Sequence, residues 1–131
     1  MRIGITGHQN LNASEINWIK NEFENEIKRL KISEAYSCLA IGTDQLFADL
    51  ILANKIPLTV IIPCKDYDST FANNGLINYD RLLKLSTRAI QLNFQKPSEE
   101  AFLEAGKTVI NNCDILFAVW NNLPSMGLGG T

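Results

Sequence analysis

The sequence has few of the residues that simple catalytic and metal sites require. It contains one histidine and three cysteines in 131 residues. Cys38, Cys64 and Cys113 are far apart in the sequence, whereas a structural zinc site needs closely spaced ligand pairs. We therefore expect three reduced, packed thiols and no bound metal. A catalytic Cys–His pair is disfavoured but stays open.

The chain also lacks an excess of positive charge. It has twelve Lys and Arg residues against fourteen Asp and Glu residues, a net charge of -2 and an isoelectric point near 5.3. This balance supplies no general attraction for a phosphate polymer, and no cluster of Lys and Arg supplies one locally. A nucleic-acid partner is therefore disfavoured.

Long apolar segments are missing as well. No apolar run approaches the roughly twenty residues that are needed to cross a bilayer. Residues 1–15 do not show the apolar core and small-residue cleavage site of a signal peptide. We expect a cytoplasmic protein with no membrane partner, and no motif indicates a cofactor.

What the sequence does contain is an ordinary globular composition, 46% hydrophobic and 20% charged. Its apolar residues follow strand and helix periods in turn. Strands are predicted at residues 2–6, 36–41, 57–62, 89–94 and 114–120, and helices near 13–31, 43–52, 76–85 and 97–112. This order predicts a single domain over residues 1–131, a three-layer α/β/α sandwich with a mostly parallel, Rossmann-like sheet of five strands.

Local signals fix several boundaries in this prediction. Asn12 or Ser14 is expected to cap the first helix, and Thr43 or Asp44 the second. The strand at residues 89–94 alternates strictly, which indicates a position near a sheet edge. Residues 64–74 have no clear period and predict a loop, whose aromatic and acidic side chains form either a lid or ordinary surface packing.

Glycine recurs where predicted strands end, in residues 6–10, 40–45 and 127–131. Glycine allows close approach of a ligand, and the N–H groups at a following helix start favour an anion. Ligands of such sheets bind beyond the carboxyl ends of the strands. Together the three loops predict a small phosphate-bearing ligand.

Four side chains in or near these loops have both a functional and an ordinary interpretation. His8 is either an acid–base or phosphate-contacting group or a neutral loop histidine, and Asp44 is a ribose acceptor, a helix cap, or both. Trp120, followed by Asn121, either stacks on a base or belongs to the core. The candidate ligand-binding residues are Thr6, Gly7, His8, Gly42, Thr43, Asp44, Trp120, Asn121, Gly127, Gly129, Gly130 and Thr131.

Residues 2–8 (RIGITGH), 40–46 (AIGTDQL), 112–120 (NCDILFAVW) and 127–131 (GLGGT) together resemble the SLOG superfamily. This superfamily of Rossmann-like nucleotide-binding domains includes the LOG-type nucleoside phosphoribohydrolases, the DNA-processing DprA proteins and bacterial sensor domains. The resemblance implies a nucleotide or an ADP-ribose-like ligand. It places the family's first-turn glycine at Gly7, its second loop at Gly42 and Asp44, and its phosphate loop at residues 127–131.

One departure from the LOG pattern affects the predicted activity. In the LOG hydrolases the glycine-rich loop is followed by a helix with a catalytic glutamate, which has no counterpart in residues 1–131. We expect a chain truncated at its C-terminus, with an apolar flank of the sheet left open to self-association or a homo-oligomer.

Three functions are compatible with these patterns. The first is a sensor or binding domain for a nucleotide-derived ligand, which the lack of an obvious nucleophile or acid–base pair favours. The alternative is a LOG-like enzyme that hydrolyses a nucleoside monophosphate or transfers its ribosyl group, in which a carboxylate stabilises the developing oxocarbenium ion. Asp44, His8 and Asp68 are the candidates for this chemistry, and no motif supports them. A DprA-like DNA binder is disfavoured by the acidic balance.

Overall fold

Strands and helices alternate along the chain. The computed structural model describes residues 1–7 and 11–119. The strands are β1 (Arg2–Thr6), β2 (Glu34–Ser37), β3 (Leu58–Ile62), β4 (Arg88–Gln91) and β5 (Ile115–Ala118). The helices are α1 (Ala13–Arg29), α2 (Thr43–Ala53), α3 (Asn73–Leu85) and α4 (Glu99–Asn112), with a 3₁₀ helix, η1, at Tyr67–Thr70.

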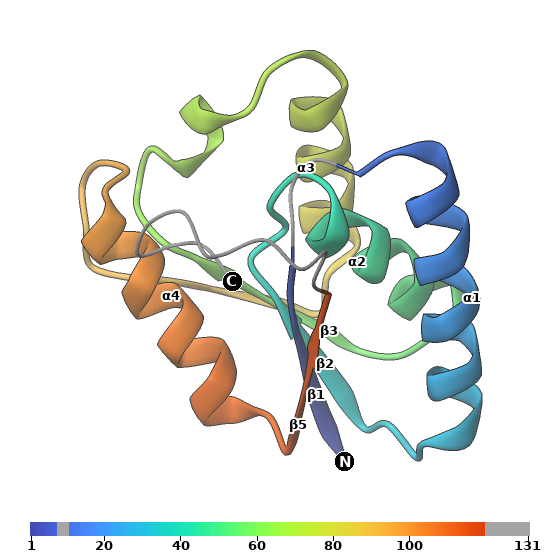
Figure 1. The fold of residues 1–131 in the computed structure, drawn as a ribbon. Helices are drawn as coiled ribbons and strands as arrows, with labels where there is room; N and C mark the ends of the chain where they lie inside the picture. The colour runs from blue at the N-terminus through green and yellow to red at the C-terminus, as the bar shows by residue number, and fades with distance from the viewer. Residues whose placement is uncertain (8–10, 120–131) are drawn as a thin grey trace.

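The strands form one sheet in the order β4-β3-β2-β1-β5, and every pairing is parallel. α4 lies on one side of this sheet, and α1 and α2 lie on the other (Figure 1). From β1 the chain moves in one direction as far as β4, and then α4 carries it to the opposite side of β1 for β5. The predicted α/β class and its Rossmann-like sheet are therefore confirmed, and the sheet is wholly parallel.

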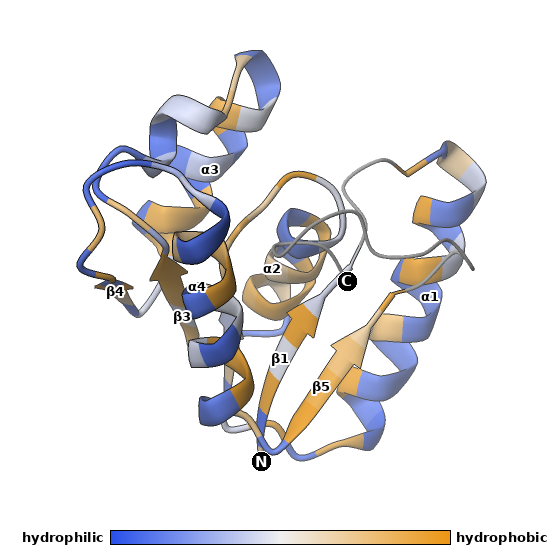
Figure 2. Ribbon diagram, turned by 60° about the vertical axis from the view of Figure 1, so that its left-hand side comes forward, coloured by the Kyte–Doolittle hydropathy of each residue, from blue (hydrophilic) through white to orange (hydrophobic). Residues whose placement is uncertain are grey.

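The larger part of the core lies between the sheet and α1 and α2. Phe23 of α1, Phe47 of α2 and Phe117 of β5 meet there, with ring centroids 5.4 to 6.1 Å apart. Figure 2 shows the strands in largely hydrophobic colours from β4 at one edge to β5 at the other. Because α1 alternates apolar and polar residues at a helical period, its apolar stripe faces this core and its polar face points outward.

The opposite side of the sheet holds a smaller cluster beneath α4. Val109 and Ala105 of α4 pack there with Tyr36 and Ile61. α4 approaches β1 closely, because a Cβ at Gly4 would lie 2.7 Å from Cγ1 of Val109. This close packing fixes the position of α4 over the middle of the sheet.

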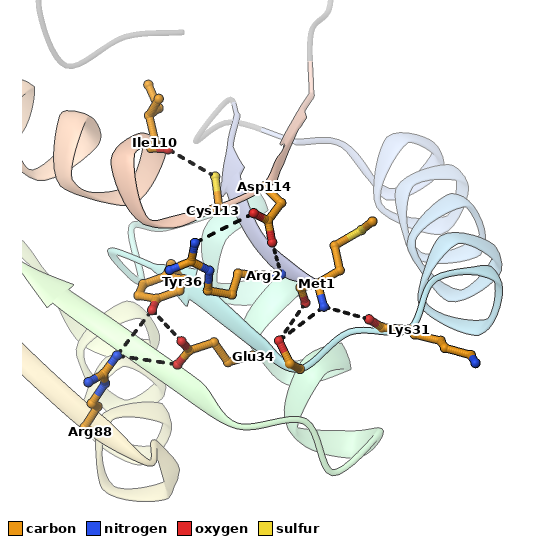
Figure 3. A network of polar contacts seen from close by, with 10 residues as sticks. Met1, Arg2, Lys31, Glu34, Tyr36, Arg88, Ile110, Cys113 and Asp114 are labelled. Atoms are coloured by element: carbon orange, nitrogen blue, oxygen red, sulfur yellow. Dashed lines mark hydrogen bonds and ion pairs between the residues drawn. The ribbon is translucent and has the colours of Figure 1, made fainter.

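Polar contacts gather at the amino ends of the strands (Figure 3). The Arg2 backbone N–H donates to Asp114 Oδ2 at 2.8 Å, and the Tyr36 hydroxyl donates to Glu34 Oε1 at 2.5 Å. Arg88 donates to the Tyr36 hydroxyl oxygen at 3.2 Å and lies 3.6 Å from Glu34. These contacts join β1 to the start of β5, and β2 to β4, at the end of the sheet opposite the predicted ligand loops.

Several local predictions are confirmed. Asn12 caps α1 in a capping box with Glu15. α4 begins close to its predicted start, and its N-cap, Ser98, accepts from the Ala101 N–H at 3.0 Å. β4 is an edge strand, as its alternation predicts. The three cysteine thiols are free.

Several boundaries were predicted wrongly. β4 ends at Gln91 rather than at residue 94, and α3 begins at Asn73 rather than near residue 76. β2 ends at Ser37 rather than near residue 41, because Leu39 adopts a φ of 57° and turns the backbone out of the strand. The N-cap of α2 is Gly42, with a φ of 90°, and neither Thr43 nor Asp44 provides the cap. The predicted irregular stretch at residues 64–74 contains η1 and the start of α3.

No helix in the described part of the chain is long and apolar enough to span a membrane.

Candidate functional site

A cavity of about 670 Å³ opens where the sheet ends beneath α4. Its floor is made by the carboxyl ends of β1, β2 and β3 and the loops that follow them. This size lies within the range of small-molecule sites. The lining residues are Ile5, Thr6, Gly7, Cys38, Ala40, Ile41, Asp44, Pro63, Tyr67, Thr70, Phe71, Pro97, Phe102, Leu103, Ala105, Gly106, Lys107, Val109, Ile110 and Leu116.

The loop between β2 and α2 is bent sharply into this cavity. Leu39 is fully buried in the left-handed region, and its N–H donates to Ser37 Oγ at 3.0 Å. The Gln45 side-chain amide donates to the Leu39 carbonyl at 3.2 Å and to the Gly75 carbonyl at 3.1 Å. A leucine is held in this conformation only where its surroundings fix it. Because of this bend, the residues before and after Leu39, Cys38 and Ala40, both line the cavity.

Asp44 is the buried carboxyl group of the site. Only 9% of the residue is exposed, and its Oδ2 accepts the Ala40 N–H at 3.3 Å. Burial raises the pKa of Asp44 to about 7, although backbone hydrogen bonds from Ala40 and Cys38 act in the opposite direction. The same surroundings raise the pKa of the Cys38 thiol, through burial first and the Asp44 charge second. Asp44 is therefore able to exchange a proton near neutral pH, whereas Cys38 stays protonated.

One wall of the cavity is aromatic. Tyr67 and Phe71 are buried and lie edge to face, with centroids 5.1 Å apart, and Phe71 stacks on Tyr79 at 4.6 Å. Tyr67 also meets Phe102 of α4 at 6.2 Å. Of the two interpretations of residues 64–74, the structure favours packing, because Tyr67 and Phe71 are buried in this wall, whereas Asp68 is exposed.

The other wall is α4, which sequence reasoning did not place at the site. Phe102, Gly106 and Ile110 line the cavity, and so does Lys107, the one cation among the described lining residues. The Lys107 Nζ lies 3.4 Å from Glu104 Oε1 on the same helix. A sequence signal for this wall existed in the apolar and glycine positions that repeat every four residues from Phe102 to Ile110.

The structure brings together part of the predicted ligand site. Thr6, Gly7 and Asp44 line the cavity. Thr43 is fully buried against Gly7, and Gly42 stands at the N-cap of α2; neither is among the lining residues. The remaining predicted residues lie outside the described residues: His8, Trp120, Asn121, Gly127, Gly129, Gly130 and Thr131.

The part of the chain that the structure describes provides no metal centre. Among residues 1–7 and 11–119, no group of three or more His, Cys, Asp or Glu side chains could hold a metal ion. The polar side-chain groups among the described lining residues are hydroxyls, one thiol, one carboxyl and one amine, which suit an organic ligand with hydrogen-bond donors and an anionic part.

The fold and the cavity define a Rossmann-like α/β protein whose strand ends face a cavity of about 670 Å³. Comparisons with protein-family models and with curated proteins find no match. Among solved structures, the chain is similar to that of TM1055, with a TM-score of 0.58 at 12% identity. The match covers 89% of this chain and 59% of TM1055. At this identity the likeness shows the fold alone, and the resemblance to the SLOG superfamily stays a prediction.

Proposed function

We propose that this domain binds a nucleotide or nucleotide-derived ligand, either a nucleoside phosphate or an ADP-ribose-like molecule, as a sensor or binding domain. One observation carries the proposal: Thr6, Gly7 and Asp44, chosen from two separate loops, line one cavity of about 670 Å³ at the carboxyl ends of the strands. Ligands of open parallel sheets bind at this edge.

The polar groups of the cavity suit the parts of such a ligand. Thr6 and Thr70 offer hydroxyls, and Asp44 offers a carboxyl that can accept from ribose hydroxyls. Lys107 offers a positive charge for a phosphate, and the first turn of α2, which has no side-chain cap, adds a favourable dipole. Because the pKa of Asp44 is about 7, a neutral fraction exists near pH 7 and reduces repulsion of an anion.

The test is binding of AMP, NAD and ADP-ribose, measured by thermal shift and calorimetry. We expect at least one of them to stabilise the protein, and Lys107→Met to weaken its binding by about tenfold, because a charge-assisted contact is lost. Lys84→Met removes the same charge from an exposed position on α3 and should leave the affinity unchanged. Equal losses in both variants would contradict the phosphate contact assigned to Lys107, and no binding by the parent chain would contradict the proposal itself.

A second candidate function rests on Asp44 itself. A carboxyl group with a pKa of about 7 in a ligand cavity is matched to general acid–base catalysis. This favours the LOG-like alternative, in which water cleaves the N-glycosidic bond of a nucleoside monophosphate and the base leaves protonated. Chromatography would detect adenine released from AMP. Release that Asp44→Asn abolishes supports an enzyme, whereas binding without release supports a sensor.

A further inference from the structure

Gly106 leaves a gap in the apolar wall that α4 presents to the cavity. Phe102, Gly106 and Ile110 follow one another at intervals of four residues, so they share one face of the helix. All three line the cavity, and Ile110 is 54% exposed although it is apolar. The gap therefore has an apolar side chain one turn before it and another one turn after it.

Packing within the described residues does not require glycine at this position. A Cβ at Gly106 would meet no heavy atom within 4 Å, whereas at Gly4 it would lie 2.7 Å from Val109 Cγ1. A glycine in the middle of a helix lowers helix stability relative to alanine. Gly106 thus weakens α4 without a packing gain, and the space it opens belongs to the cavity.

That space suits a flat ring. The helix backbone at Gly106 has its N–H and C=O groups engaged within the helix, so its surface toward the cavity offers no unpaired polar group. A planar ring can lie close to this surface only if no side chain projects from it. Phe102 and Ile110 would then contact the edges of the ring, one turn before and one turn after Gly106.

We propose that Gly106 forms the floor of a subsite for a planar heterocyclic ring, bounded by Phe102 and Ile110. The inference rests on the proposed function, because the ring is the base of the nucleotide-derived ligand. In this arrangement the sugar lies toward Thr6 and Asp44 at the strand ends.

Calorimetry with AMP, ribose 5-phosphate and adenine tests the subsite. Gly106→Leu fills the gap, so the affinity for AMP and for adenine should fall by about tenfold or more. The affinity for ribose 5-phosphate should change by less than about twofold. Asn111→Leu, an exposed position on α4 that does not line the cavity, is the matched control and should change none of the three. Ile110→Ser is a second variant that keeps the fold, because Ile110 is exposed. It should also lower the affinity for AMP and adenine.

The outcomes separate this inference from the proposed function. If AMP binds and neither variant weakens it, the ring subsite is wrong and the proposed function stands. If Gly106→Leu weakens AMP and ribose 5-phosphate equally, leucine blocks the whole cavity and the ring subsite is again wrong. If the parent chain binds adenine but neither phosphate, and Gly106→Leu removes that binding, the subsite stands without the proposed function. Binding of none of the three overturns the subsite, and the proposed function is overturned with it if NAD and ADP-ribose also fail to bind.

Discussion

The side chain of Thr43 lies directly against Gly7, so that a Cβ at residue 7 would be 2.6 Å from Thr43 Cγ2. This contact joins the end of β1 to the first turn of α2, the two segments that the sequence places at a ligand site. Thr43 is fully buried and cannot move aside into solvent. The glycine at residue 7 is therefore required by packing, whatever else it contributes to ligand binding.

Gly7→Ala should destabilise the fold through this contact. We expect the free energy of unfolding to fall by about 1–3 kcal/mol, the usual cost of overpacking a buried site. Urea denaturation measures it. Gly106→Ala is the matched control, because its added methyl meets nothing within 4 Å, and it should raise stability by about 0.5–1 kcal/mol. Equal stability of Gly7→Ala and the parent chain would show that the end of β1 does not pack tightly against the first turn of α2.

Gly4→Ala should be destabilising for a different reason, because the added methyl pushes against Val109 Cγ1 on α4. We expect a loss of about 1–3 kcal/mol in urea denaturation. Val109→Ala removes the atom in the way, so the double variant should lose less than the two single losses together. Strictly additive losses would mean that α4 does not rest on β1 at this point.

The alternation of strands and helices could be predicted from the sequence because each element has its own period. α1 shows this clearly, since its apolar stripe and its Asn12 cap both lie within one local segment. The end of β2 could not be predicted in the same way. Leu39 continues the apolar run of the strand in the sequence, whereas tertiary contacts, its burial and its hydrogen bonds with Ser37 and Gln45, hold it in the left-handed region.

The candidate site was predicted in part for a related reason. Glycines at strand ends indicate the loops after β1 and β2, and three of the residues chosen there line the cavity. The α4 wall was not predicted, because a helix stripe such as Phe102, Gly106 and Ile110 has the same pattern whether it faces a core or a cavity. Only the packing of α4 beside the strand ends separates these two cases.

Asp44 should make stability depend on pH. Burial raises its pKa to about 7 from 3.8, so the native protein keeps a proton that the unfolded chain has already released. The free energy of unfolding should therefore fall as pH rises from about 4 to about 7. Above about pH 7 the ionisation of Asp44 should change it no further. Urea denaturation across this range checks the slope.

Asp44→Asn removes this ionisation while its amide oxygen can still accept the Ala40 N–H. At pH 8 the variant should be more stable than the parent chain by up to about 4 kcal/mol, and near pH 4 the difference should be small. The same change at exposed Asp80 is the control and should leave the slope unaltered. A variant that is less stable than the parent at pH 8 would show that the carboxylate is favourably held.

Gln45→Leu should loosen the loop that carries Cys38, Ala40 and Asp44 into the cavity. The Gln45 amide donates to the carbonyls of Leu39 and Gly75, and leucine would leave both without this donor. We expect a loss of about 1–3 kcal/mol.

Hydrogen exchange by mass spectrometry would locate the effect, with faster exchange in residues 38–45 and at the start of α3. Asn54→Leu is the control at the other end of α2, where the Asn54 amide donates to the Leu50 carbonyl at 2.7 Å. It should leave exchange in residues 38–45 unchanged, since that loop is a full helix length away. If Gln45→Leu costs stability but exchange there stays slow, Ser37 and the packing of Leu39 hold the bend without the amide.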